Sequence, residues 1–156
     1  MDCFSLTVDQ EGVATLLFDT PDSSANVFSA EAIEELDSKL TSLQDNKGVK
    51  VLLFVSGKES IFIAGADIKE IVTISTVEEA EQKSKQGYDT FSLFTKLPFP
   101  TVAVVQGVCL GGGLECVLAC DYIVTSDDAK TVFALPEVKL GIIPGWGGTQ
   151  LLPKKI

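Results

Sequence analysis

The sequence TVAVVQGVCLGGGLE, residues 101–115, passes from a run of apolar residues through a glycine-rich turn to a glutamate. A short, nearly continuous apolar run such as 101–105 is typical of a strand buried inside a sheet. The glycines within 107–113 predict a turn, and the residues after them predict a helix that ends at about Asp121. Because a further strand is expected at 122–125, this region predicts a strand, a helix and another strand.

The N-terminal third of the chain extends this alternation. Residues 4–8 and 13–18 are short β-rich runs separated by a polar turn, which predicts a hairpin near the edge of a sheet. Ser29 can cap a helix whose apolar residues recur at helical spacing as far as Leu43. Residues 47–48, a lysine and a glycine, are expected to end that helix.

The central third predicts another strand and a long helix. Residues 49–55 are almost continuously apolar, which predicts a strand covered on both faces. Residues 77–97 predict a helix whose inward side carries Val77, Ala80, Phe91 and Phe94. Strands that alternate with helices favour parallel pairing through right-handed crossovers, so we predict one α/β domain over residues 1–156.

The charge balance excludes several classes of function. The 156 residues carry a formal net charge of −10, all twelve cations are lysines, and the sequence has neither arginine nor histidine. A nucleic acid is therefore not expected as a partner, because such binding depends on a basic face. Without histidine this chain cannot form a Ser-His-Asp or Cys-His pair, so acid and base chemistry must fall to carboxylates.

The four cysteines lie in apolar surroundings and predict buried thiols in a reducing compartment. Cys116 and Cys120 are four residues apart on an expected helix, which leaves a metal site as an alternative, although the spacing of paired zinc ligands is absent from the sequence. No apolar run is long enough to span a membrane, and the first ten residues do not have the pattern of a signal peptide.

The segment from Gly107 to Glu115 can bind an oxyanion. Three consecutive glycines let the backbone approach a ligand closely, and the first turn of a helix offers unpaired N–H groups. The alternatives are a plain tight turn or a nucleotide phosphate cradle, but the segment matches neither of the usual nucleotide-binding patterns.

A second segment, FIAGADIKE at 62–70, can supply another donor. Its small residues leave the N–H of Ala66 accessible, so that two donors could face one carbonyl oxygen across a pocket. The alternative is that the small residues only pack closely against a neighbouring strand. Asp67 is expected to cap a short helix rather than to act in catalysis.

A third segment, LPEVKLGIIPGWGGT at 135–149, contains a glutamate in apolar company. An apolar environment raises the proton affinity of a carboxylate, which suits general acid or base work near neutral pH. Glu137 is thus a candidate catalytic group. The alternative is a surface glutamate in the first turn of a helix after Pro136.

Together, these three segments resemble the crotonase, or enoyl-CoA hydratase/isomerase, superfamily. The resemblance rests on the AGAD, GGG-x-E and PE…LG…PG-x-GGT patterns in the family's order, and it covers essentially the whole chain. The phrases FIAGADI, CLGGGLE and LPEVKLGIIPGWGGTQLLP look most like the hydratase region of multifunctional fatty-acid oxidation α subunits. The resemblance implies a fold of ββα-type superhelical repeats, in which the family's C-terminal helices would lie beyond residue 156.

The resemblance also implies a set of site residues for hydration of a 2-enoyl-CoA. The backbone N–H groups of Ala66 and Gly112 would hold the thioester carbonyl, while Glu115 and Glu137 would hold one water and manage its proton. Their division into acid and base is left open. Gly145 would help to place the water or substrate. Binding of the CoA part would fall to residues around the AGAD segment, namely Lys58, Ala64, Gly65, Asp67, Ile68 and Lys69.

Further expectations concern the whole protein. Isomerisation of a 3-enoyl-CoA could use the same site, and the rival from another class is an acyl-CoA-binding or assembly fragment without activity. The resemblance implies no metal and no cofactor for these residues, since NAD would bind only to a dehydrogenase part beyond them. It implies a homo-oligomer or a complex with a thiolase β subunit, in the bacterial cytoplasm or the mitochondrial matrix, and weak or absent turnover by residues 1–156 alone.

Overall fold

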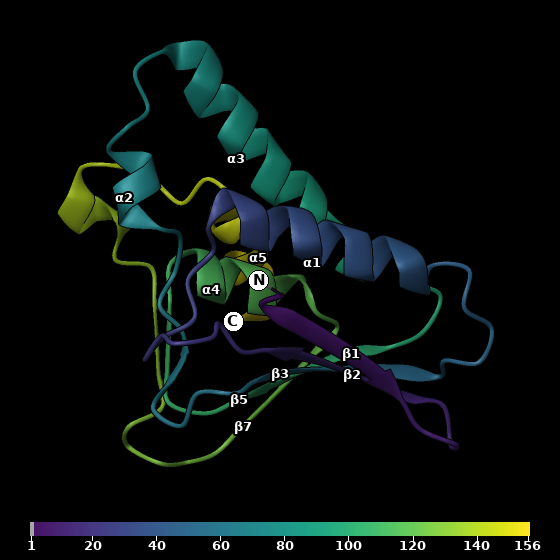
Figure 1. Ribbon diagram of the computed structural model, residues 1–156. Coiled ribbons are helices and arrows are strands. Elements are labelled where there is room, and N and C mark those ends of the chain that lie inside the picture. The colour runs from purple at the N-terminus through teal and green to yellow at the C-terminus, as the bar shows by residue number, and fades with distance from the viewer. Residues whose placement is uncertain (1) are drawn as a thin grey trace.

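The computed structural model describes residues 2–156, and its main sheet has five strands in the order β1-β2-β3-β5-β7 (Figure 1). These strands span Phe4–Val8 (β1), Val13–Phe18 (β2), Val51–Ser56 (β3), Thr101–Val105 (β5) and Tyr122–Thr125 (β7). The pair β1–β2 is antiparallel and the other neighbours are parallel. The predicted edge hairpin and the parallel pairing of the later strands are therefore confirmed.

A second, three-stranded parallel sheet lies beside the glycine-rich segments. Its strands are β4 (Ile61–Ile63), β6 (Val108–Leu110) and β8 (Val132–Ala134), in the order β4-β6-β8. The sequence had predicted a turn over the residues of β6 and no strand at the other two. Each strand has only three residues, so none is long enough to show the alternation of apolar and polar residues that indicates a strand.

Five α-helices and two single turns of 3₁₀-helix complete the described chain. They are α1 (Ala30–Leu43), α2 (Ile68–Ile71), α3 (Val77–Ser92), η1 (Phe94–Lys96), α4 (Gly112–Ala119), η2 (Glu137–Leu140) and α5 (Gly148–Lys155). In Figure 1 the helices lie on one side of the main sheet, and the N-terminal half of α3 extends away from the body of the molecule. The prediction that residues 49–55 form a strand covered on both faces is wrong. Leu52 and Phe54 are buried, whereas the other residues of β3 are only half-buried.

The helix α1 follows the predicted pattern closely. The Ser29 side chain accepts a hydrogen bond from the backbone N–H of Ala32, as an N-cap does. One face of α1, including Leu36 and Leu40, is fully buried against the sheet. The helix ends at Leu43, earlier than predicted, because residues 44–46 form tighter turns that bond back to residues 41 and 43.

The helix α3 departs from the prediction at both ends. Val77 is 68% exposed and Ala80 is also exposed, so the inward side predicted for the first turns is wrong. A capping box formed by Thr76 and Glu79 stabilises this exposed end. Only the C-terminal half is buried, and the helix ends at Ser92 before the separate turn η1.

Buried aromatic rings and one buried amide connect the sheet to the AGAD segment. Phe18 and Phe28 stack with ring centroids 5.3 Å apart. Asn26 is fully buried and its amide donates to the carbonyl of Phe18 and to the Ser56 hydroxyl, while its Oδ1 accepts from the N–H of Thr20. A buried side chain whose polar groups are all bonded fixes the path of residues 20–28.

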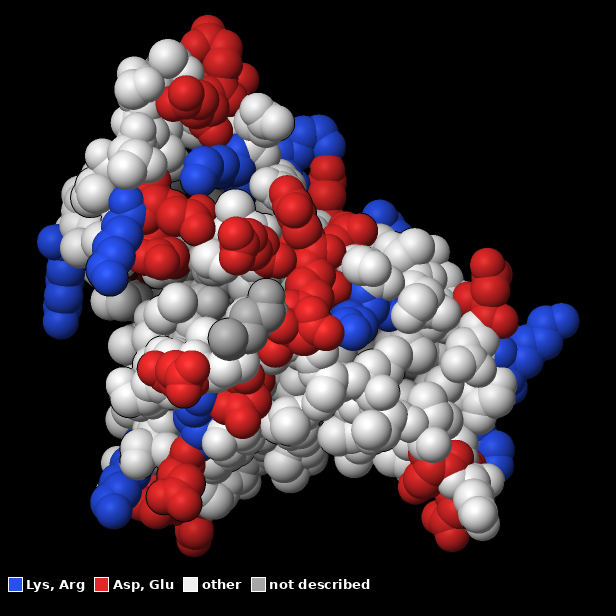
Figure 2. All heavy atoms as spheres, in the orientation of Figure 1, with Lys and Arg blue, Asp and Glu red and all other residues white. Residues whose placement is uncertain are grey.

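The surface is predominantly acidic, as the net charge requires. Figure 2 shows acidic side chains over the exposed sides of α1 and α3, with lysines scattered among them. Within residues 2–156, no helix is long and apolar enough to cross a lipid bilayer.

Candidate functional site

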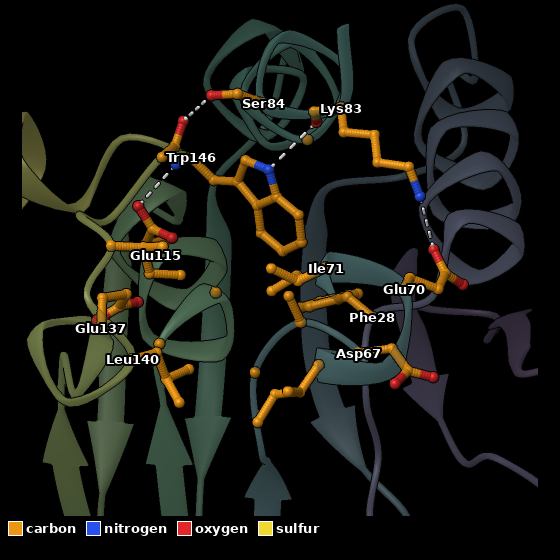
Figure 3. Close-up of a pocket in the computed structure, with 18 of the residues that line it drawn as sticks. Phe28, Asp67, Glu70, Ile71, Lys83, Ser84, Glu115, Glu137, Leu140 and Trp146 are labelled. Carbon is orange, nitrogen blue, oxygen red and sulfur yellow. Dashed lines mark hydrogen bonds and ion pairs between the residues drawn. The ribbon is translucent and has the colours of Figure 1, made fainter. Parts of the chain in front are cut away.

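A cavity of about 850 Å³ lies between α2, α3, η2 and the two glycine-rich turns (Figure 3). Its lining is mainly apolar, with Phe28, Ile71 and Trp146 among the large side chains. The charged residues of the lining are Asp67, Glu70, Lys83, Glu115 and Glu137. The structure thus brings all three predicted segments to one cavity, although its lining residues lie as far apart in the sequence as Ala64 and Trp146.

The AGAD segment is held by an extended stretch of chain that pairs with it. The N–H of Phe28 donates to the carbonyl of Gly65 at 2.8 Å, and the N–H of Asp67 donates to the carbonyl of Phe28 at 2.9 Å. Because successive groups of an extended backbone point in opposite directions, the N–H of Ala66 points away from this pairing. Gly65 has a φ of +113°, which favours glycine there.

The N–H groups of Ala66 and Gly112 lie close together at the cavity. A Cβ atom placed on Gly112 would lie 3.6 Å from the nitrogen of Ala66, and one placed on Gly65 would lie 3.8 Å from the nitrogen of Gly112. Gly112 begins α4, where the first N–H groups have no acceptor in the helix. Within the described chain neither N–H donates to another backbone group, so both can bind an oxygen of a ligand.

Glu115 points from α4 toward the cavity and is only 2% exposed. Its Oε1 accepts hydrogen bonds from the N–H groups of Trp146 and Gly148, both at 2.8 Å. Since Gly148 is the first residue of α5 and Gly147 provides no side-chain cap, the carboxylate of Glu115 caps this helix. We call these two N–H groups the Trp146–Gly148 clamp.

The protonation of Glu115 reflects opposing influences. Burial raises the pKa of the Glu115 carboxyl above its usual value, the Gly148 and Trp146 donors lower it, and the nearby Glu137 carboxylate raises it again. The net effect on the pKa is a rise. A raised pKa brings a carboxyl group closer to the neutral range in which general acid–base catalysis is most effective.

Glu137 begins η2 and lies on the same wall of the cavity as Glu115 (Figure 3). Glu137 is 8% exposed, and its Oε2 is buried without a hydrogen-bond partner among residues 2–156. A Cβ atom on Gly111 would lie 3.0 Å from the other carboxylate oxygen, so a side chain there would crowd Glu137. The alternative of a surface glutamate is therefore wrong, and Glu137 is a buried carboxylate facing the cavity.

Trp146 is a site residue that the sequence analysis missed. Its ring packs edge-on against Phe91, with centroids 5.4 Å apart, and its Nε1 donates to the carbonyl of Lys83 at 3.3 Å. Cβ atoms on Gly87 and Gly112 would approach the ring to 2.3 and 2.4 Å. In the sequence, a tryptophan flanked by glycines in the PGWGG segment could have indicated that this loop packs closely against a helix.

Gly145 lies at the cavity, but its contact is with α3. Its carbonyl accepts a hydrogen bond from the Ser84 hydroxyl at 2.9 Å. Next to Ser84, Lys83 forms an ion pair with Glu70 of α2 at 3.2 Å, and both carboxylate oxygens of Glu70 also accept from the N–H of Ala30. This pair, which the sequence analysis also missed, joins α2 and α3 across one side of the cavity (Figure 3).

The structure separates the residues expected to bind CoA into two groups. Ala64, Gly65, Asp67 and Ile68 line the cavity. The Asp67 carboxylate accepts from the N–H of Lys69 and caps α2, as predicted.

The two lysines of that prediction lie elsewhere. Neither Lys58 nor Lys69 is among the described residues that line the cavity. Lys58 forms an ion pair with Asp19 at 2.6 Å and donates to the carbonyl of Thr20 at 2.7 Å, so its ammonium group is already bound.

Three of the cysteines lie in the core. Cys109, Cys116 and Cys120 are buried, as predicted, whereas Cys3 is half-buried. Burial raises the pKa of the Cys109 thiol to about 12 and raises that of Cys116 as well. Over residues 2–156, no group of three or more potential ligand side chains is placed to hold a metal ion.

Comparisons with known proteins show the family of this chain. The sequence profile of the family described as enoyl-CoA hydratase/isomerase matches residues 8–156. Over 153 residues the chain is 44% identical to the fatty acid oxidation complex subunit alpha of Vibrio campbellii and 43% identical to that of Vibrio vulnificus. The matched part is 98% of this chain and 22% of each relative, so the chain spans about a fifth of their length.

Solved structures show the same fold. The enoyl-CoA hydratase of Bacillus anthracis superposes with a TM-score of 0.88 at 31% identity, over 98% of this chain and 58% of that one. An enoyl-CoA hydratase of Shewanella pealeana superposes with a TM-score of 0.85 at 28% identity, over 95% of this chain and 55% of that one. This chain therefore belongs to the enoyl-CoA hydratase/isomerase family and has its crotonase-like α/β fold.

Proposed function

We propose that this chain catalyses the syn addition of water to the double bond of a 2-trans-enoyl-CoA, which gives a 3-hydroxyacyl-CoA. The observation that supports this most is the position of two unpaired backbone N–H groups beside two buried carboxylates at one cavity. The donors suit a thioester carbonyl, and the carboxylates suit a water molecule and its proton. The mainly apolar lining suits an acyl chain.

The N–H groups of Ala66 and Gly112 would bind the thioester oxygen. As water adds to the β carbon, the carbonyl becomes enolate-like and negative charge gathers on this oxygen. Fixed donors stabilise that charge more strongly than the neutral carbonyl of the substrate, and loss of one such donor costs on the order of 3 kcal/mol of activation energy.

Glu115 and Glu137 would handle the water between them. The oxygen of water forms the new bond to the β carbon, one of its protons stays as the hydroxyl hydrogen, and the carboxylate pair accepts the other. The pair delivers a proton to the α carbon, so the two glutamates end the cycle as they began it. The Glu137 charge raises the pKa of Glu115, so the carboxylate of one glutamate affects the proton affinity of the other.

The composition supports a carboxylate mechanism. The chain has no histidine, so no imidazole within it can move the proton. Glu115 and Glu137 are the only buried glutamates among the described residues.

A second candidate reaction is the isomerisation of a 3-enoyl-CoA to the 2-enoyl-CoA. The unbonded Oε2 of Glu137 favours it, because an oxygen without a partner can take a proton from one carbon and return it to another. The same enolate forms, and the same two N–H groups would stabilise it. An isomerase assay on the same preparation distinguishes the two reactions.

We further propose that the physiological substrate is an acyl-CoA of fatty-acid β-oxidation and that the whole protein works in a complex with a thiolase β subunit. The support is the similarity to relatives named fatty acid oxidation complex subunit alpha. We propose that residues 1–156 need no metal or cofactor for the hydration, because the carboxylates and N–H groups supply the chemistry.

The test is an assay of the full-length protein with a short 2-enoyl-CoA, followed by the loss of conjugated-thioester absorbance. We expect hydration, and we expect Glu115→Gln and Glu137→Gln each to lower kcat by roughly 10²–10⁴-fold. The matched control is Glu34→Gln, since Glu34 is an exposed glutamate of α1 and should tolerate the change.

A calorimetric titration with an acyl-CoA completes the test. Binding without hydration or isomerisation would show that the chain is an acyl-CoA-binding or assembly module. Full activity in either site variant would also refute the proposed mechanism.

A further inference from the structure

A single peptide group connects α3 to Glu115. The carbonyl of Gly145 and the N–H of Trp146 belong to the same planar peptide unit. The Ser84 hydroxyl donates to that carbonyl at 2.9 Å, and the N–H on the other side donates to Oε1 of Glu115 at 2.8 Å. Figure 3 shows these two hydrogen bonds on opposite sides of the Gly145–Trp146 peptide.

Such an arrangement acts on the carboxylate in two ways. Because the peptide is rigid, a hydrogen bond that fixes its carbonyl also fixes the direction of its N–H. A hydrogen bond to the carbonyl oxygen further polarises the peptide, which strengthens its N–H as a donor. Ser84 itself makes no hydrogen bond to Glu115 within the described chain, so any influence passes through the peptide.

We propose that Ser84 is a positioning residue of the active site, which orients the Gly145–Trp146 peptide and thereby strengthens the Trp146–Gly148 clamp on Glu115. The catalytic consequence of this role rests on the proposed function of Glu115. The relay itself, meaning the hydrogen bond from Ser84 to the Gly145–Trp146 peptide and the one from that peptide to Glu115, does not depend on the proposed function.

Neighbouring contacts of α3 hold the same loop. The Nε1 of Trp146 donates to the carbonyl of Lys83, and Gly87 leaves room for the indole ring. These contacts do not depend on the Ser84 side chain. Replacing Ser84 by alanine should therefore leave the loop in place while removing one bond of the relay.

The titratable groups around Glu115 are the same in the wild type and in a variant of Ser84, so a difference in the titration of Glu115 can be assigned to Ser84. Glu137 faces it from η2, and Cys116 follows it on α4. The ammonium group of Lys83, on α3, is paired with Glu70 and points away from Glu115 (Figure 3). None of these groups is altered by a change at Ser84.

The test uses Trp146, which is the only tryptophan in the sequence. The backbone amide resonance of this residue is followed by NMR as a function of pH, because its N–H bonds directly to the titrating carboxylate. Weakening one N–H donor to the ionised form should raise the midpoint, and the usual strength of one hydrogen bond corresponds to a shift of about 0.5–1 pH unit for Ser84→Ala.

Two further variants sharpen this experiment. Ser84→Thr keeps a hydroxyl and should restore the wild-type midpoint. Ser92→Ala makes the same chemical change on the same helix, but its hydroxyl bonds to the carbonyl of Asp89 and should leave the midpoint unchanged. Circular dichroism confirms that every variant is folded, and a variant that fails to fold is replaced by Ser84→Cys, which keeps the size of the side chain.

The outcomes separate this inference from the proposed function. A raised midpoint in Ser84→Ala supports the relay even if the protein shows no hydratase activity, in which case only the proposed function fails. If the protein is active, the Glu115-dependent limb of its pH–rate profile should shift upward by the same amount. An unchanged midpoint in Ser84→Ala, or a shift of equal size in Ser92→Ala, overturns the inference.

Discussion

A substitution at Gly112 tests how tightly the cavity wall is built. A Cβ atom at this position would lie 2.4 Å from Cζ3 and 2.5 Å from Cε3 of Trp146, well inside contact distance. The indole ring cannot easily move aside, because Phe91 and Phe28 pack against it and its Nε1 is bonded to α3. Gly112→Ala should therefore force the ring and the start of α4 apart.

The magnitude follows from these contacts. Overpacking a well-packed site costs about 1–3 kcal/mol, so Gly112→Ala should lower the free energy of unfolding by that amount. Trp146→Ala should lower it by about 3–5 kcal/mol through the cavity it leaves. With the ring removed, the alanine at position 112 has no obstacle, and its higher helix propensity should stabilise the protein by up to about 1 kcal/mol.

The assay is a double-mutant cycle in urea, followed by far-UV circular dichroism because Trp146 is absent from two of the variants. We expect a coupling energy of about 1–4 kcal/mol between the two sites, because the overpacking cost at position 112 is replaced by the gain in helix propensity. Gly48→Ala is the control, since this glycine is exposed and the one atom near its Cβ position is Oδ1 of the exposed Asn46 side chain, at 3.3 Å. Additive effects of Gly112→Ala and Trp146→Ala would refute the proposed contact.

Two other predictions concern stability. Glu115→Gln should raise the free energy of unfolding at pH 7, because a carboxyl whose pKa is raised on folding favours the folded state when protonated and loses that contribution as pH rises. Unfolding curves should converge with the wild type as pH falls below about 4, and a constant difference would contradict the reasoning. Asn26→Leu leaves the N–H of Thr20 without its acceptor, whereas the carbonyl of Phe18 keeps its hydrogen bond from the N–H of Gly57, so the change should lower stability by about 1–3 kcal/mol. Urea unfolding measures this, and a loss under 1 kcal/mol would contradict it.

Helices and strands whose apolar residues recur at a regular spacing could be predicted from the sequence. The pattern from Ser29 to Leu43 gave the helix α1 because its cap and its apolar face agree. The exposed first turn of α3 was predicted wrongly, since apolar residues such as Val77 suggest burial although this end is exposed and closed by a capping box. The three short strands of the second sheet escaped prediction because their stability comes from pairing between segments distant in the sequence.

The candidate site was predicted in its residues but not in its connections. Patterns around Glu115 and Glu137 indicated the two carboxylates, and the structure places both at one cavity. The sequence could not show that Glu115 caps α5, because the cap joins residues more than 30 positions apart. It likewise gave no sign that Lys58 is paired with Asp19 rather than turned to the ligand.

The most direct test of the central claim is the rate of 2-enoyl-CoA hydration by the two single glutamine variants and by the double variant. If Glu115 and Glu137 act as one unit on one water, the double variant should lose about as much kcat as either single variant, roughly 10²–10⁴-fold. Losses that multiply, or a double variant that still hydrates at the wild-type rate, would contradict the shared role of the two carboxylates.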